Sequence, residues 1–190
     1  MGKHDAVLPA LSSLQEWTPR DTLAALPLVN ADAHRGGMRH VAAAVTVITA
    51  GVGDTRAGFT ATAVCSVTAE PPRLVVFANK NVYASTTILT QGALCVNVLA
   101  AHQEELARAF AGMLPGVQGE ARFRYGQWDG GLSGAPVLAG AKASFDCRVV
   151  KVFDESTHYA FLCEVLATRE DSAGDALLYM GGRFRRLADD

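Results

Sequence analysis

Short runs of β-branched and apolar residues, separated by glycine, proline or acidic turns, recur along most of this chain and limit the folds open to it. Three such runs are 44–49, 93–99 and 159–168, and each has the length and composition of a strand. Helical spacing is confined to two or three segments, which do not alternate regularly with the strands. Because a doubly wound parallel sheet needs that alternation, we predict a mainly β (α+β) fold. Roughly seven or eight antiparallel strands would form a closed or nearly closed barrel.

Two further segments favour antiparallel pairing. Residues 143–153 alternate apolar and polar side chains, as expected of a strand with one buried face. Residues 177–180 and 183–187 flank the pair Gly181-Gly182, which predicts a β-hairpin.

The first 32 residues differ from this pattern, and we predict an N-terminal extension over 1–32. Its prolines divide it into short pieces. Short helices are predicted from Ser12 and from Asp21, and the rest is either flexible or covers a partner subunit. Asp32 is predicted to cap a helix over 33–43, the first element of a domain that spans 33–190.

Charge and hydropathy argue against several functional classes. The net charge of −2 and the pI near 6.2 give no attraction to nucleic acid or to an anionic membrane. No apolar run approaches the roughly 20 residues of a membrane span, and the N-terminus lacks the apolar core of a signal peptide. We therefore expect a cytoplasmic protein. The cysteines lie in apolar runs without zinc spacing, so we expect reduced core residues and no metal site.

The segment from Gly58 to Val67 is the most informative stretch for function. Its sequence, GFTATAVCSV, alternates small hydroxyl and small apolar residues beside a glycine. Such a strand lets a planar ligand approach the backbone closely, and its N–H, C=O and hydroxyl groups suit the polar edge of a flavin ring. An ordinary threonine-rich edge strand gives the same pattern, because threonine favours β-structure.

A second candidate segment, 79–87, joins a strand to a helix. Asparagine, lysine, serine and threonine side chains gather there at a helix N-terminus, where unpaired N–H groups and the helix dipole attract phosphate. The alternative is simple capping of the helix by Asn81 or Ser85.

His158 opens a strand after a short polar turn. It is suited to contact a nicotinamide or flavin edge, and the alternative is a solvent-facing loop histidine. The sequence has no Ser-His-Asp order, no H-E-x-x-H motif and no paired-carboxylate catalytic motif, which is consistent with a redox role. Hydride transfer between two bound rings needs placement and exclusion of water rather than such groups. No G-x-G-x-x-G follows a strand, so any nicotinamide would bind without a Rossmann half.

Taken in order, these segments resemble the flavin reductase-like family, whose members include the small reductase components of two-component flavin monooxygenases. The resemblance covers about Met38 to Leu187. It rests on Met38-Arg39-His40 with 45–49, on 58–63 with Ser66-Val67 and Glu70-Pro71-Pro72, on Asn79 and Ser85, on 95–99, on His158, and on Leu178-Tyr179 with Gly182-Arg183-Phe184. Two positions depart from the family pattern. Ser156-Thr157-His158 keeps only the histidine of a Gly-Asp-His tripeptide, and Ala42-Ala43-Ala44 replaces Pro-Thr-Gly.

The resemblance implies a split β-barrel homodimer, a Greek-key-like FMN-binding barrel with a few flanking helices and with flavin between barrel and helices. It assigns Thr60, Ala61, Thr62, Ser66 and Val67 to the isoalloxazine ring, Asn79, Lys80, Ser85 and Thr86 to the ribityl phosphate, and His158 to the nicotinamide side. Asn97 is also placed among the cofactor-binding residues.

From this resemblance we expect an NAD(P)H:flavin oxidoreductase. Hydride would pass from NADH or NADPH to N5 of FAD or FMN, with FAD favoured, and the reduced flavin would diffuse to a separate monooxygenase. Two alternatives remain open. One is a flavin-binding or storage protein without nicotinamide turnover, which the altered tripeptide would suit. The other is a split-barrel haem-binding protein, with His158 or His102 as the axial ligand and His34 and His40 also available.

Overall fold

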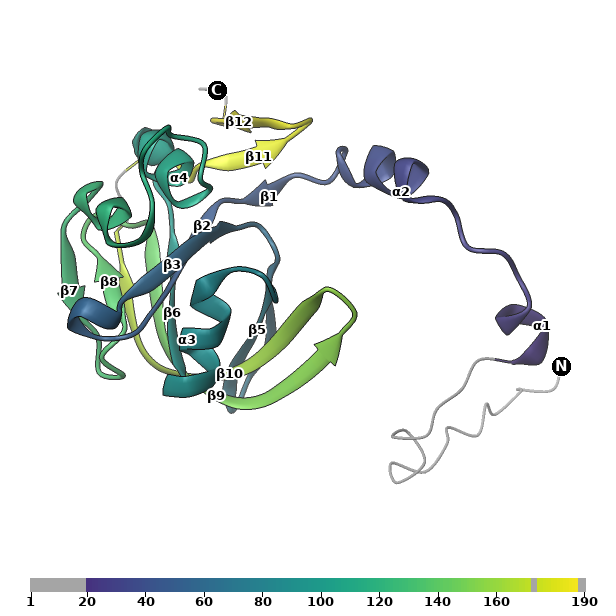
Figure 1. Cartoon of the computed structure of the whole chain (residues 1–190), viewed down its shortest axis with the longest axis horizontal. Coiled ribbons are helices and arrows are strands. Elements are labelled where there is room, and N and C mark those ends of the chain that lie inside the picture. Colours follow the sequence, from purple (N-terminus) through teal and green to yellow (C-terminus); the bar gives the residue numbers. More distant parts are fainter. Residues whose placement is uncertain (1–19, 172–173, 188–190) are drawn as a thin grey trace, which may run out of the picture. The chain divides into compact units, whose positions relative to one another are not determined.

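Figure 1 shows the computed structural model, which describes residues 20–171 and 174–187. The chain divides into two units, residues 1–38 and residues 39–190. Two helices are described in the first unit, α1 (Asp21–Ala24) and α2 (Ala31–Met38), and neither contains a buried residue. The helix predicted from Ser12 lies outside the described residues.

Both helices of this unit start one or two residues earlier than predicted. The N-cap of α1 is Arg20 rather than Asp21. The helix α2 begins at Ala31 because Asn30, not Asp32, caps it: the Asn30 Oδ1 accepts a hydrogen bond from the Ala33 amide at 2.8 Å. It ends at Met38 instead of the predicted 43, after two glycines that favour helix poorly.

The second unit is built on a seven-stranded antiparallel sheet in the order β3-β2-β6-β9-β10-β5-β4. Its strands are β2 (Thr46–Ala50), β3 (Ala57–Ala61), β4 (Val64–Ala69), β5 (Pro72–Asn79), β6 (Ala93–Val98), β9 (Ala143–Glu155) and β10 (His158–Glu170). The edge strands β3 and β4 are consecutive in the sequence, with residues 62 and 63 between them, so the chain joins the two edges of the sheet at this corner although these two strands are not paired. The predicted mainly β barrel is thus confirmed.

Short elements flank the barrel (Figure 1). They are β1 (Ala43–Ala44) with β11 (Leu178–Met180) and β12 (Arg183–Arg185) in one small sheet, the hairpin of β7 (Trp128–Gly130) and β8 (Pro136–Leu138), the helices α3 (Tyr83–Gln91) and α4 (Glu104–Phe110), and the 3₁₀ turns η2 (Gly53–Thr55), η3 (Ala101–Gln103) and η4 (Gly119–Arg124).

Two apolar clusters share strand β2 between them. Inside the barrel, Ile48 packs with Phe161 of β10 and with Ile88, which α3 contributes to the interior. On the opposite face of β2, Val47 packs with Phe110 of α4. All five residues of this strand are buried, Thr46 and Thr49 included, which explains why its sequence does not alternate apolar side chains with charged ones.

The glycine-rich sequence of residues 112–135 predicts a long loop, but this segment contains regular structure. Phe123 of η4 and Trp128 of β7 pack against Phe110, with ring centroids 5.1 and 5.4 Å from it. The pattern within this segment could not reveal η4 and β7, because the side chain that organises them belongs to α4.

The predicted hairpin near the C-terminus is confirmed as β11 and β12. Gly181 and Gly182 have φ values of +66° and +76°, which a two-residue hairpin turn with both φ positive requires. Tyr179 and Phe184 face one another across the strands, with centroids 5.3 Å apart. None of the helices in residues 20–171 and 174–187 has the length and apolarity to cross a membrane.

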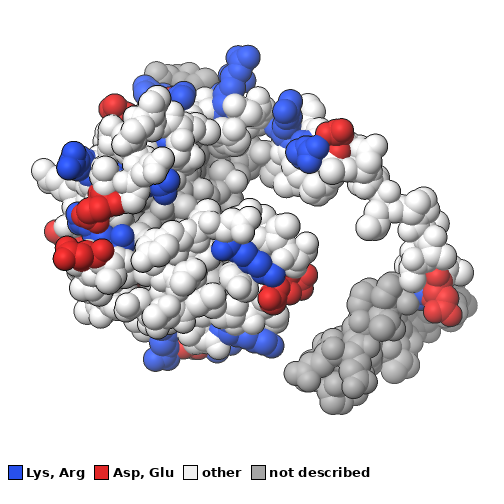
Figure 2. Space-filling model, viewed as in Figure 1, with Lys and Arg blue, Asp and Glu red and all other residues white. Residues whose placement is uncertain are grey.

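On the face of residues 39–190 shown in Figure 2, basic and acidic side chains are scattered in small groups over a largely uncharged surface.

Candidate functional site

Strand β3 carries the segment singled out from the sequence and forms an open edge of the sheet. Its Gly58 is buried against α4. A Cβ at this position would lie 2.7 Å from the Phe110 ring and 2.8 Å from the Ile48 carbonyl oxygen, so only glycine fits. Two residues further on, the Thr60 hydroxyl donates a hydrogen bond to the carbonyl of Ala107 at 2.7 Å, which ties β3 to α4.

An apolar cleft of about 170 Å³ opens beside the end of β3. Small side chains of β3 and the residue after it line one part, and Met113, Tyr179 and Phe184 line another. The three consecutive residues predicted to line the isoalloxazine ring, 60–62, therefore share one cleft with two aromatic rings.

The predicted phosphate residues meet at the start of α3. Ser85 is buried, and its hydroxyl donates to the carbonyl of Asn79 at 2.8 Å, while Thr86 is exposed. Neither Asn81 nor Ser85 caps the helix, although simple capping was the alternative reading of this segment. Val82 occupies the N-cap position, and no side-chain hydrogen bond caps the first turn.

His158 begins β10 and lies directly opposite Asn79 in the ladder between β10 and β5. Its Nδ1 is 2.8 Å from the Thr157 hydroxyl. The Lys80 amide donates to the Thr157 carbonyl at 3.0 Å, and the Lys80 ammonium group pairs with Asp154. The ladder thus brings the predicted nicotinamide contact beside the predicted phosphate residues.

A larger cavity, of about 640 Å³, lies between the start of α3, the first residues of β3 and the segment that follows α4. Its charged lining residues are Asp54, Arg56, Glu120 and Arg122. The Arg56 Nε donates to Glu120 at 2.7 Å, and this hydrogen bond raises the pKa of Arg56 and lowers that of Glu120. Arg122 donates from Nη1 to the Gly58 carbonyl at 3.2 Å, whereas its buried Nε has no hydrogen-bond partner. The guanidinium group of Arg122 is therefore incompletely hydrogen-bonded.

Ser66 and Val67 lie on β4, beyond the corner where β3 ends. Both are exposed, Val67 by 50%, and neither lines the cleft beside β3. The structure therefore places these two predicted ring contacts on a neighbouring open strand.

Asn97 lies in the barrel wall, completely buried. Its Nδ2 donates to the carbonyl of Val47 at 3.1 Å and to the Thr49 hydroxyl at 3.2 Å. Its Oδ1 accepts from the Leu138 amide at 2.8 Å and from the Ser144 hydroxyl at 3.0 Å. The chain itself occupies both ends of this amide, and the structure does not bring Asn97 to the other predicted site residues.

The four cysteines are free thiols, but they fall into two groups. Cys95, Cys147 and Cys163 are buried, as predicted, and burial raises the pKa of each, to about 12 for Cys163. Cys65 is exposed on β4, so the predicted core role is wrong for this residue. Within the described ranges, no group of three or more His, Cys, Asp or Glu side chains is placed to hold a metal ion.

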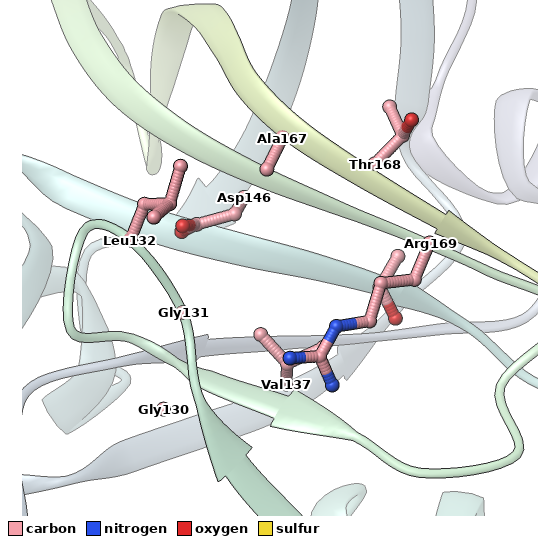
Figure 3. Close-up of a pocket in the computed structure, with 9 residues that line it drawn as sticks. Gly130, Gly131, Leu132, Val137, Asp146, Ala167, Thr168 and Arg169 are labelled. Atoms are coloured by element: carbon pink, nitrogen blue, oxygen red, sulfur yellow. The ribbon is translucent and has the colours of Figure 1, made fainter.

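Another hollow, of about 150 Å³, lies beside the hairpin of β7 and β8 (Figure 3). Asp146 is buried there and accepts a hydrogen bond from the Ser133 amide at 2.9 Å and another from the Ser133 hydroxyl. Arg169, whose guanidinium group reaches over Val137 in Figure 3, pairs with Asp129 at 2.6 Å. Chain groups thus bind both charged residues of this hollow, and its lining contains none of the predicted site residues.

Sequence reasoning overlooked the segment after α4 as a source of site residues. Met113 lines the apolar cleft and Arg122 the larger cavity, while Arg56 precedes β3. The glycines of residues 112–119 are the one signal that was available, since long glycine-rich loops on a rigid scaffold often line binding sites.

Comparisons with known proteins agree with this arrangement. Residues 38–188 match the family model described as flavin reductase like domain. The chain is 41% identical over 162 residues to the FMN reductase (NADH) RutF of Ancylobacter novellus, covering 85% of this chain and 88% of that protein. It is 44% identical over 155 residues to the 4-hydroxyphenylacetate 3-monooxygenase reductase component of Pseudomonas aeruginosa, covering 82% and 91%. The structure resembles the NADH:FAD oxidoreductase of Streptomyces globisporus in complex with NAD and FAD fragments. The TM-score is 0.76 and the identity 31%, over 87% of this chain and 99% of that one.

Proposed function

The chain belongs to the flavin reductase-like domain family, and from this premise we propose that it is an NADH:flavin oxidoreductase acting on free flavin. The observation that carries the proposal is the apolar cleft at residues 60–62. The segment that follows α4 lines this cleft and also lines the polar cavity at the start of α3. A flavin nucleotide has a planar apolar ring and an anionic arm, so both of its parts have a matching surface here.

The residues that would hold the flavin follow from this placement. Thr60, Ala61 and Thr62 would line the ring, and Ser66 and Val67 on the neighbouring strand would complete its surroundings. The start of α3, with Asn79, Lys80, Ser85 and Thr86, would receive the phosphate end. The flavin, when bound, supplies the hydride-accepting chemistry, and the chain's part is to bind, orient and exclude water.

His158 would border the nicotinamide. It lies in the same cross-strand pair as Asn79, and directly opposite residues in such a pair have Cβ atoms roughly 5 Å apart. The family tripeptide is altered to Ser156-Thr157-His158, and the Thr157 hydroxyl bonded to Nδ1 would fix the orientation of the imidazole ring.

We propose FMN as the preferred flavin, although FAD was favoured from the sequence resemblance. The RutF proteins at about 40% identity are named FMN reductases (NADH). The NADH:FAD oxidoreductase of Streptomyces globisporus is 31% identical, so it keeps FAD as the alternative to be tested.

We propose that the chain is a homodimer formed through the outer face of β5, β9 and β10. Phe77 and Phe153 flank Ala160 in one cross-strand row, and they are 38% and 39% exposed. Val75 and Leu162 pair in a row on the same face, nearer the other end of β5. An exposed apolar face of this kind favours association, and a second copy is the occupant that the family resemblance implies. His158 and Asn79 border this face, so the partner would lie close to the site.

We propose that a separate monooxygenase accepts the reduced flavin and that this chain is located in the cytoplasm. The Pseudomonas aeruginosa relative is named as the reductase component of a monooxygenase, which supports the proposal for this chain. An exchangeable flavin is required, because a product has to leave.

The test is steady-state oxidation of NADH by the purified chain with FMN, FAD or riboflavin in excess. We expect oxidation that saturates with flavin, best with FMN. Thr62→Trp should fill the cleft and raise KM for flavin, whereas Thr90→Trp, also exposed but on α3 away from the cleft, should leave it unchanged. Flavin binding without NADH oxidation would instead establish the storage alternative, and a haem spectrum would establish the haem-binding one.

A further inference from the structure

The turn that joins β9 to β10 carries His158 and has a backbone conformation that proteins seldom use. Only Ser156 and Thr157 separate the two strands, and Glu155 pairs with His158 across the ladder. Ser156 has a φ of +48°, in the left-handed region that favours glycine and that residues with a side chain seldom adopt. Such a conformation persists only where neighbouring groups hold it. The position of His158 therefore depends on the contacts that hold residues 154–157.

Lys80 makes three contacts with residues that flank His158. Its amide donates a hydrogen bond to the Thr157 carbonyl at 3.0 Å. Its ammonium group forms an ion pair with Asp154 and lies 5.2 Å from the centroid of the Tyr159 ring. One residue thus binds this turn through its backbone and through its side chain.

The imidazole ring of His158 is bonded within the same turn. Its Nδ1 is 2.8 Å from the Thr157 hydroxyl, and the carbonyl of Thr157 accepts the hydrogen bond from Lys80. Thr157 therefore links Lys80 to His158. Asn79, which precedes Lys80, pairs directly with His158 in the ladder between β5 and β10. Release of Lys80 from the turn would remove a restraint on the residue that orients the imidazole ring.

Two other roles for Lys80 have to be distinguished from this one. A surface ion pair alone contributes little, because water and salt screen it, and the Asp154 side chain is 69% exposed. Lys80 also stands beside the proposed phosphate end of the flavin, but in the structure its ammonium group pairs with Asp154. Removal of Asp154 separates the roles, since a phosphate ligand would be freed by it and a turn restraint would be lost.

We propose that Lys80 is a positioning residue for hydride transfer: it holds the turn 154–157 and, through Thr157, keeps the imidazole ring of His158 at the nicotinamide edge. This inference rests on the proposed function, in which His158 borders the nicotinamide. The role toward NADH is separate from any contact of Lys80 with the flavin phosphate. It affects the rate because hydride transfer needs the reacting rings in a narrow range of geometry.

The experiment measures kcat/KM for NADH with saturating FMN, in the full chain. The variants are Lys80→Gln, Asp154→Asn, His158→Ala and the double variant Lys80→Gln/His158→Ala. Lys151→Gln is the matched control, because it removes a lysine charge from β9 of the same hairpin. Lys151 is exposed and forms no ion pair within residues 20–171 and 174–187. Dissociation constants for FMN and riboflavin are measured by quenching of flavin fluorescence.

We expect Lys80→Gln and Asp154→Asn each to lower kcat/KM for NADH by roughly two- to tenfold, the factor that corresponds to the loss of one hydrogen bond. Dissociation constants for FMN and riboflavin should keep their wild-type values. In the His158→Ala background, Lys80→Gln should have no further effect, because the residue through which it acts is absent. Lys151→Gln should match the wild type.

A second measurement follows the imidazole ring without turnover. In protein labelled with 15N-histidine, the NMR signals of His158 are those that His158→Ala removes. His102, exposed on η3, supplies a reference in the same spectrum. Lys80→Gln should shift the ring signals of His158 and leave those of His102 unchanged.

Weaker binding of FMN but not of riboflavin in Lys80→Gln, with unchanged kcat/KM for NADH, would overturn the proposal and make Lys80 a phosphate ligand. Equal losses from Lys80→Gln with and without His158 would overturn it as well, and so would unchanged His158 signals. A wild-type chain that oxidises no NADH would refute the proposed function. The NMR comparison would still decide whether Lys80 holds His158.

Discussion

Replacement of Asn97 by alanine tests whether this residue belongs to the cofactor site or to the barrel wall. Sequence resemblance places it among the cofactor-binding residues. In the structure its amide makes four hydrogen bonds with nitrogen and oxygen atoms of the chain, accepts a weaker one from the Cys95 thiol at 3.6 Å, and is completely buried. We expect Asn97→Ala to lower the free energy of unfolding without a specific effect on flavin binding.

The size of the effect follows from those four bonds. The Leu138 amide is buried, and it would lose its Asn97 acceptor, at a cost of about 1–3 kcal/mol. The bonds to Val47 and Ser144 contribute about 1 kcal/mol each. The bond to Thr49 contributes less, because the Thr49 hydroxyl keeps its own hydrogen bond to the Pro136 carbonyl. We therefore expect a loss of about 4 kcal/mol, within the 5–15 kcal/mol of a typical domain.

Urea unfolding and flavin titration together decide the question. Ser144→Ala removes one of the four bonds and should lower the unfolding free energy by about 1 kcal/mol, as a graded control. Both variants should keep the wild-type dissociation constant for FMN wherever they are folded. An Asn97→Ala protein of unchanged stability that no longer binds FMN would refute the structural role and restore the cofactor role.

Three further predictions concern packing, charge and association. Gly58→Val should lower the unfolding free energy by roughly 1–3 kcal/mol in urea, because its added atoms would collide with the Phe110 ring; unchanged stability would contradict the close approach of β3 to α4. Hydrogen bonds from Arg73 and then Arg148 lower the pKa of Glu164 below its usual 4.5. A carboxyl with a lower pKa in the folded state stabilises the fold above its unfolded pKa and loses that contribution as pH falls through the folded value. As the pH is lowered below about 4.5, the thermal midpoint of Glu164→Gln should therefore fall less steeply than that of the wild type. Equal steepness would count against a stabilising role for the ion pairs of Glu164 with Arg73 and Arg148. Phe77→Asp should give a monomer by light scattering, and a persisting dimer would exclude the outer face of β5 as the interface.

The sequence predicted those parts of the fold whose signals are local. Gly181-Gly182 marks a turn that needs positive φ, and residues 143–153 show the alternation of a strand with one buried face. The run at 44–49 was read as a strand for its β-branched residues. Its burial on both faces depends on packing against α4, and no local pattern reveals a contact between segments so far apart in the sequence.

Elements defined by distant contacts were missed. The segment 112–135 looks like a loop, yet Phe123 and Trp128 fold it onto Phe110. Cys65 stands in the same kind of apolar run as the buried cysteines, but its strand is an edge of the sheet and is exposed.

The candidate site likewise has residues that the sequence indicates and residues that only the structure reveals. Composition singles out the segments that hold residues 60–62 and the start of α3, the family resemblance assigns their roles, and the structure places them at a cleft and beside a cavity. Asn97 was assigned by motif alone, and a motif does not show which side of the barrel wall an amide faces. Met113 and Arg122 lie in the segment after α4, which carries no site motif, and only the tertiary structure reveals that one lines the cleft and the other the larger cavity.

The most direct test of the central claim is anaerobic mixing of NADH with a large excess of FMN over the protein, followed by the bleaching of the visible flavin absorbance. The account predicts that all the FMN is reduced, one NADH per flavin, because each reduced flavin leaves the site. Bleaching that stops at one flavin per binding site, or none at all, would contradict the claim that this chain supplies free reduced flavin.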